Sequence, residues 1–251
     1  WGQYSGAGGV SKYLPHTFTG SRSQNRSDIF GKRATPIRLR MDTIDHAQRT
    51  ALKRKPMSAN NPPALSLQRV YSFEQDYDIW IPWGGRGSPY PSVIAVSAPA
   101  NATLVDVNVR VTGTIARFDS LDILLVGPAS ENVMLASDAA YSATVLDGLT
   151  PLALTLDDEA AAVLPASYVS LIGSFRPFNF GDNPDDDGDK FPAPAPAGPW
   201  GSTLSVFDGT APNGNWSLYV TADLYYDLDQ GFLTSWGLDL TVSAAVPVYT
   251  E

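Results

Sequence analysis

The chain has 251 residues, 43% of them hydrophobic, so it is long enough to bury one large core or two small ones. It has no cysteine, which excludes disulfides, thiolate metal sites and cysteine nucleophiles. The net charge of -9 is divided unevenly: residues 1–70 hold twelve Lys and Arg against three Asp and Glu (net +9), and residues 71–251 hold five against twenty-three (net -18). A basic segment therefore precedes an acidic body.

Residues 1–36 are rich in Gly, Ser and Arg and show little periodicity, which predicts an extended or disordered arm. Aromatic residues recur along it at wide spacing: Trp1, Tyr4, Tyr13, Phe18 and Phe30. This spacing suits a segment that lies over another surface, and a free tail is the alternative. The chain begins at Trp1, as a processed secreted protein or an excised fragment would.

Residues 43–55 are the one good helix candidate. Asp42 can cap its first turn, basic residues gather in its last turn, and Pro56 ends it. The basic end raises the question of nucleic acid, but no stacking aromatics lie nearby and the acidic body would repel a polyanion. The sequence NNPPA at 60–64 is a linker, so we place a boundary between an arm at 1–68 and a folded domain at 69–251.

From Val70 onward the pattern becomes all-β. In Leu104–Thr112, Val105, Val107, Val109 and Val111 alternate with polar residues, which predicts a half-buried strand. Further strands are expected at 70–73, 78–82, 92–98, 121–126, 132–136, 152–156, 168–172, 203–207, 215–222 and 232–242, and a short helical turn at 160–164. Many short strands separated by turn residues predict a jelly-roll-like β-sandwich.

The closing stretch, residues 208–242, contains two amphipathic strands and an acidic loop between them. Trp216, Leu218 and Val220 share one face of the first strand, and Trp236 begins the apolar face of the second. The order of NGNWSLYV, an acidic loop and SWGLDL resembles the end of the P domain, the β-sandwich that follows the catalytic domain in subtilisin-like proprotein convertases. SPYPSVIAVSAP, VDVNVRVTGT and SLDILLVGP resemble its early strands, so the resemblance covers about residues 72–243.

The segment GDNPDDDGD is the first candidate metal site. Asn183, Asp185 and Asp187 recur every second residue and Gly188 follows, which is the D-x-[DN]-x-[DN]-G arrangement of calcium loops with Asn in first place. Pro194 stands where an EF-hand carries its glutamate, so the loop is not an EF-hand. Other ligands would come from Asp182, Asp189, backbone carbonyls or a distant strand. A solvated acidic loop without metal is the alternative.

The acidic loop with Asp223, Asp227 and Asp229 is the second candidate. The P-domain resemblance implies calcium near these aspartates, although DLYYDLDQG is bulkier than the usual loop. Asp119 and Asp122 are weaker candidates, and in the family a residue like Asp122 more often orders its loop than binds metal. Calcium is therefore the expected cofactor, and the sequence leaves open which loop binds it.

Catalysis is not expected. The two histidines, His16 and His46, both lie in the arm, and the serine motifs of subtilases and hydrolases are absent. A carboxylate pair for glycoside hydrolysis stays open, because aspartates are plentiful.

Three functions remain. The first is a secreted, non-catalytic structural or interaction protein whose arm reaches an acidic neighbour and builds a homo-oligomer or polymer. The second is an accessory P domain of a subtilisin-like protease or other surface enzyme. The third is an adhesin or carbohydrate-binding module that uses Trp83, Tyr90 and Trp200. No apolar run is long enough to span a membrane.

Overall fold

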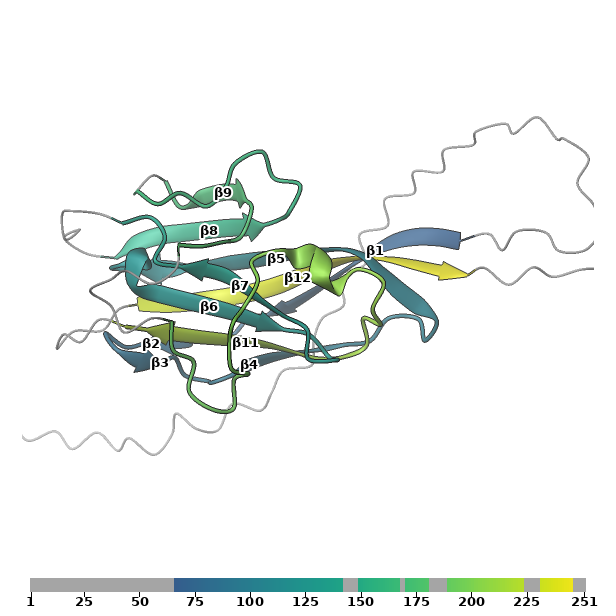
Figure 1. Ribbon diagram of the computed structural model, residues 1–251, viewed down its shortest axis with the longest axis horizontal. Coiled ribbons are helices and arrows are strands. Elements are labelled where there is room, and N and C mark those ends of the chain that lie inside the picture. The colour runs from purple at the N-terminus through teal and green to yellow at the C-terminus, as the bar shows by residue number, and fades with distance from the viewer. Residues whose placement is uncertain (1–65, 142–148, 168–169, 181–188, 224–230, 246–251) are drawn as a thin grey trace, which may run out of the picture. The chain divides into compact units, whose positions relative to one another are not determined.

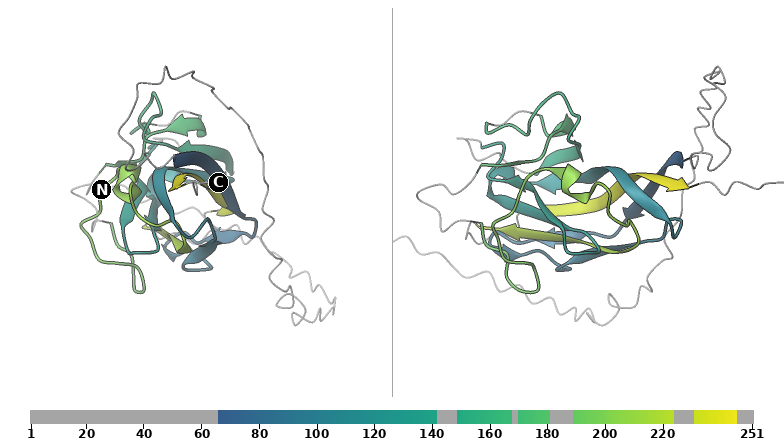
Figure 2. Two further views of the ribbon diagram at one scale, coloured as in Figure 1. Left: turned by 90° about the vertical axis from the view of Figure 1, so that its right-hand side faces the viewer. Right: turned by 45° about the vertical axis from the view of Figure 1, so that its right-hand side comes forward.

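The computed structural model describes residues 66–141, 149–167, 170–180, 189–223 and 231–245 as two facing six-stranded sheets (Figures 1 and 2). Sheet A has the order β1 (Ser66–Gln75), β12 (Gly231–Ala245), β5 (Ala102–Ile115), β8 (Thr150–Leu156) and β9 (Ile172–Phe175), and β2 (Ile79–Ile81) also pairs with β12. Sheet B has the order β10 (Phe178–Asn179), β7 (Asn132–Ser137), β6 (Leu121–Val126), β11 (Gly214–Ala222) and β3 (Gly85–Arg86), and β4 (Ser92–Val96) also pairs with β11. The predicted all-β sandwich is confirmed. Residues 1–65 of the predicted arm, including its helix at 43–55, lie outside the described residues, and residues 66–68 belong to β1.

The apolar faces of β11 and β12 form the middle of the core, as their alternation predicts. Trp216, Leu218 and Val220 on β11 are buried, and so are Trp236 and its apolar neighbours on β12. Phe207 packs on Trp216 with the ring centroids 4.8 Å apart. The Trp216 indole donates to the Pro212 carbonyl (3.0 Å), so burial leaves its N–H paired.

A bulge in β5 corrects one detail of the predicted pattern. Thr241 pairs with Asp106 and Val242 with Leu104, so Val105 is the extra residue. Leu104 therefore enters the core with Val107, whereas Val105 stays 36% exposed. The prediction that Val105 shares the buried face was wrong, because an unbroken period of two cannot represent an inserted residue.

Two predicted elements were wrong and one lies partly outside the described residues. The expected strand at 203–207 is a 3-10 turn, η2 (Leu204–Phe207), and it buries Leu204 and Phe207 at a spacing of three. The expected helical turn at 160–164 is a bend followed by an isolated bridge, since the Leu164 amide and the Ala162 carbonyl bond to Arg176 instead. β9 begins at Ile172, at the end of the strand expected at 168–172. A second 3-10 turn, η1 (Phe118–Ser120), precedes β6.

The outer face of sheet B is covered by the chain segment 189–203. Leu124 on β6, Met134 on β7 and Tyr219 on β11 point away from the central core, yet all three are buried. The Tyr219 hydroxyl on this face donates to the Pro194 carbonyl (3.3 Å), and the Met134 amide donates to the Gly201 carbonyl (2.8 Å), which fixes the end of the segment beside β7. Sheet B is thus buried on both faces.

Among the described residues, no helix is long and apolar enough to cross a membrane.

Candidate metal centre

Asp122 is the most deeply buried carboxyl group that the structure describes. It is the second residue of β6, on the outer face of sheet B, and it is 2% exposed. The Thr221 hydroxyl on the neighbouring strand β11 lies 3.4 Å from its Oδ2. Burial raises the pKa of Asp122 well above the ordinary value, because the charged form loses its solvation. A carboxyl group in such a place either keeps its proton or needs a cation.

Three more carboxyl groups lie close to Asp122. In decreasing order, the charges of Asp189, Asp223 and Asp138 raise the pKa of Asp122 further. Asp138 directly follows β7, and Asp223 directly follows β11, where its amide donates to the Ser120 carbonyl (3.2 Å). The four side chains therefore gather at the same end of sheet B, from three adjacent strands and the covering segment.

Both oxygens of Asp189 accept hydrogen bonds. The Ser137 hydroxyl donates to Oδ1 (2.5 Å) and the Asn179 amide donates to Oδ2 (3.1 Å). Ser137 and Asn179 are paired residues of β7 and β10, so two strands hold this carboxylate in place. The Ser137 hydroxyl also contacts Asp122, and this bond lowers the pKa of Asp122 against the larger effect of burial.

One described residue from each predicted calcium loop lies near Asp122. Asp189 ends the first loop and Asp223 begins the second, and both flank Asp122, which the sequence ranked below them. The other predicted ligands lie outside the described residues: Asp182, Asn183, Asp185, Asp187, Asp227 and Asp229. The loops that sequence reasoning treated as alternatives are therefore joined to one group of carboxylates.

The donor set fits a hard cation in part. Carboxylate oxygens are the ligands that calcium prefers, and calcium takes six to eight of them. In the described ranges, no group of three or more His, Cys, Asp or Glu side chains is arranged to hold a metal ion by itself. A complete coordination shell would need further oxygens, from backbone carbonyls, water or other carboxylates.

Sequence reasoning missed Asp138 and underrated Asp122. Asp138 directly follows a buried strand and has a positive φ of 51°, which aspartate tolerates better than most residues. The signal for Asp122 was a charged residue inside an otherwise apolar strand, LDILLV. Asp119 has a different role, since Arg117 pairs with both of its oxygens, at 2.8 Å through Nε and at 2.5 Å through Nη2.

A second acidic cluster lies away from the first and was not predicted. It consists of Asp106, Asp157, Asp158, Glu159 and Asp208. Burial, followed by the charge of Asp157, raises the pKa of Asp106. Burial, followed by the charges of Asp106 and Asp158, raises the pKa of Asp208. The carboxylates of this cluster repel one another.

The aromatic residues considered for sugar stacking take part in packing. Tyr90 meets Tyr219 edge-on, with ring centroids 5.0 Å apart, and its hydroxyl donates to the Pro192 carbonyl (3.0 Å). Trp200 meets Phe191 edge-on at 5.2 Å, and its indole donates to the Pro196 carbonyl (3.2 Å). Trp83 is half-buried. The rings of Tyr90 and Trp200 help to hold the segment that covers sheet B. His16 and His46 lie outside the described residues.

No known family model matches the chain, and no curated protein is similar to it. Among solved structures, the fold is similar to part of the serine protease of Aeromonas sobria, with 16% sequence identity and a TM-score of 0.33 over 75% of this chain. It is also similar to part of the complex of this protease with the chaperone ORF2, with 17% identity and a TM-score of 0.34 over 76% of this chain. The chain spans 28% of the length of each matched protein.

Proposed function

We propose that this chain is a secreted, non-catalytic structural or interaction protein. Its β-sandwich is stabilised by calcium bound at Asp122, and its basic arm joins copies into a filament or another surface polymer. The observation that carries the proposal is the gathering of Asp138, Asp189 and Asp223 around a buried Asp122. Four carboxylates so close together are unfavourable without a cation. A bound cation would stabilise the folded domain, which suits a structural role.

The charge distribution supports the assembly part of the proposal. Residues 1–70, which are the arm and the first two residues of the folded domain, have a net charge of +9, and the rest of the chain has -18. Carboxylates on the described sandwich gather in a second cluster around Asp106, where burial and the neighbouring charges raise the pKa of Asp106 and of Asp208. A basic segment from a neighbouring copy would relieve this repulsion, and a head-to-tail contact of this kind extends into an open polymer.

Deletion of residues 1–60 tests the assembly. The full chain is expected to sediment as a broad distribution of large species and to form polymers in electron micrographs. The deleted chain should sediment as a single small species with an unchanged melting temperature. If the chain assembles equally well with and without residues 1–60, the proposal is contradicted.

An accessory β-domain of a subtilisin-like protease or other surface enzyme is the second candidate. Its support is the resemblance of NGNWSLYV, the acidic loop and SWGLDL to the closing motif of the P domain. A chain of this kind would stabilise a catalytic domain next to it. The complete gene product decides between the two, because a subtilase domain encoded upstream would favour the accessory role.

A further inference from the structure

The edges of the two sheets differ greatly in length. In the described part of the chain, the edge strands of sheet B are β3 and β10, with two residues each, and β4, with five, while β9 lies at one edge of sheet A with four. β1 closes the other side of sheet A with ten residues. Short edge strands protect a sheet from unwanted pairing, whereas a long one offers a row of backbone donors and acceptors to another strand. β1 is the longest edge strand of the described sheets.

The first half of β1 is open. Residues 66–70 are all exposed, and they include Leu67 at 46% and Val70 at 62%. One edge of β1 pairs with β12 along its whole length, and its other edge pairs with no described strand. At the far end, Phe73 enters the core and the Gln75 amide donates to the Val93 carbonyl (3.1 Å). In Figure 1 the open half lies beside the end of β12.

The two faces of the open edge differ in chemistry. Leu67 and Tyr71 lie on the face of the core, opposite Ala244 and Leu240 of β12, with the exposed Arg69 between them on the same face. Val70 and Glu74 lie on the outer face, which also carries Asp239 and Asp106. A strand added to β1 would therefore complement it best with apolar residues on one face and basic residues on the other.

One segment of the arm has this pattern. Ile37, Leu39 and Met41 alternate with Arg38 and Arg40, and no other run in residues 1–65 has three large apolar residues at this period. Pro36 precedes the run, and proline is tolerated as the first residue of a strand. The 24 residues from 42 to 65 separate the run from Ser66, which at about 3.3 Å each is ample length to reach another molecule.

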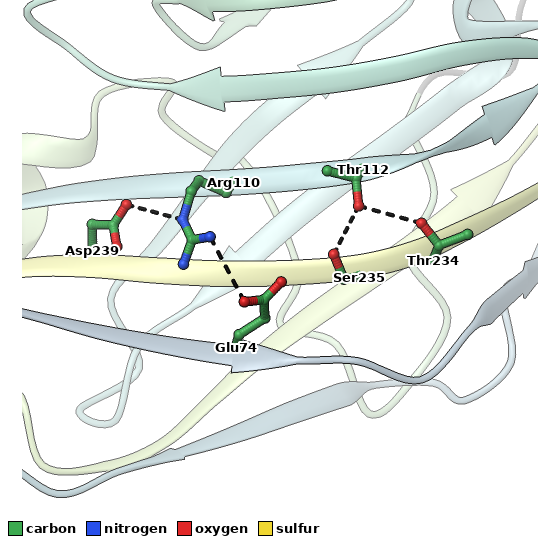
Figure 3. Close-up of polar contacts among 6 residues, drawn as sticks. All are labelled: Glu74, Arg110, Thr112, Thr234, Ser235 and Asp239. Atoms are coloured by element: carbon green, nitrogen blue, oxygen red, sulfur yellow. Dashed lines mark hydrogen bonds and ion pairs between the residues drawn. The ribbon is translucent and has the colours of Figure 1, made fainter. Parts of the chain in front are cut away.

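We propose that the open edge of β1 receives residues 36–41 of a second copy as an added strand. The proposal rests on the self-assembly proposed above and names its contact. The apolar residues of the run cover Leu67 and the exposed side of Tyr71, while Arg38 and Arg40 face the side of Glu74. The carboxylate of Glu74 lies 3.8 Å from Arg110, which also pairs with Asp239 at 2.9 Å, so two acidic groups there share one guanidinium (Figure 3).

Disulfide trapping tests the contact directly, because the natural chain has no cysteine. Chains with Arg38→Cys or Arg40→Cys are produced together with chains carrying Gln68→Cys, Val70→Cys or Ser72→Cys, and are then oxidised gently. The matched control is Ile172→Cys on the other edge of sheet A, since Ile172 is 61% exposed and Val70 is 62% exposed. A disulfide requires its two Cβ atoms about 3.5–4.5 Å apart, so trapping reports the register as well.

We expect at least one arm and β1 pair to give ten times more linked dimer than the same arm cysteine gives with Ile172→Cys. Equal yields at both edges would overturn the inference. The deletion of residues 1–60 separates a failure of the β1 contact from a failure of the proposed self-assembly. If deletion abolishes assembly while trapping at β1 fails, the arm docks elsewhere and only the β1 contact is refuted. If deletion leaves assembly unchanged, the proposed function falls together with the contact.

Discussion

The outer faces of the two sheets have opposite environments. On sheet B, the outward side chains Leu124, Met134 and Tyr219 are buried beneath the segment 189–203. On sheet A, Arg110 and Asp239 remain about one-third exposed, and Thr112 bonds to Ser235 (2.7 Å) and Thr234 (3.3 Å) in a polar ladder across β5 and β12 (Figure 3). Sheet B is thus a middle layer, whereas the outer face of sheet A remains in contact with solvent.

This difference explains where a metal site can form. A carboxyl group on the covered face, such as Asp122, loses its water and becomes sensitive to every neighbouring charge. Asp106, which lies on the other sheet, keeps more of its solvation, and its pKa is raised less strongly. The covering segment therefore contributes more than packing, because it helps to create the low-dielectric surroundings that disfavour the charged form of Asp122.

The largest expected effect is on the free energy of unfolding, which should respond differently to substitutions on the outer faces of sheets A and B. Leu124→Ala removes fully buried methyl groups from the outer face of sheet B, and it should lower the free energy of unfolding by about 3 kcal/mol. Thr234→Ala on the exposed face of sheet A is the matched control and should change it by less than about 0.5 kcal/mol. Urea denaturation measures both values, and equal losses would show that sheet B is not covered as described.

The next effect is a pH dependence of the metal-free protein. The pKa of Asp122 is raised in the folded state, mainly by burial and then by the charge of Asp189. In the unfolded chain, the pKa of an aspartate is about 3.9. Between these two values the folded state binds more protons. Stability is therefore greatest below the unfolded pKa and falls as the pH rises through the folded pKa.

Asp122→Asn should flatten this fall, and Asp106→Asn should flatten it less. Both variants and the natural chain would be unfolded with urea in chelator from about pH 4.5 to about pH 7.5, a range that begins just above the unfolded pKa. An Asp122→Asn variant with the same slope as the natural chain would contradict the assignment of this pH dependence to the buried carboxyl group.

A smaller effect concerns the orientation of Asp189. Ser137→Ala removes the hydroxyl group that donates to Asp189 Oδ1, and it should weaken calcium binding by about tenfold, since such supporting hydrogen bonds orient a ligand. Calorimetric titration with calcium measures the affinity. Ser235→Ala on sheet A is the control and should leave the affinity unchanged. An unchanged affinity in Ser137→Ala would remove Asp189 from the ligand set.

The smallest effect is expected for the ion pairs of Arg110 on the outer face of sheet A. Arg110→Met breaks the ion pairs with Asp239 (2.9 Å) and Glu74 (3.8 Å). All three side chains are partly solvated, so the loss of stability should be below about 1 kcal/mol in thermal or urea denaturation. A loss comparable to that of Leu124→Ala would mean that this face is covered after all.

The sequence predicted the inner faces of the sandwich better than the outer ones. The alternation in β12 correctly placed Trp236 and Leu238 in the core. In β11 the same period identified Trp216 but gave no sign that Tyr219 is also buried, because its cover comes from the distant segment 189–203. The bulge at Val105 was not predicted for a similar reason, since it is defined by the pairing of β5 with β12.

The candidate site was predicted only in fragments. Local spacing singled out Asp189 and Asp223 as parts of two separate loops. Their convergence on Asp122 depends on pairing between β6, β7 and β11, which brings together residues up to about one hundred positions apart along the chain. Hydrophobic period and loop composition contain no information on such long-range contacts.

Calcium-dependent melting tests the central claim most directly. A ligand that binds only the folded state at about one hundred times its dissociation constant adds about 2.7 kcal/mol. For a chain of this size, that corresponds to a rise in melting temperature of about 5–10 °C. We predict such a rise between chelator and millimolar calcium for the natural chain, and little or none for Asp122→Asn. Superimposable melting curves of the natural chain in the two conditions would contradict a calcium site at Asp122.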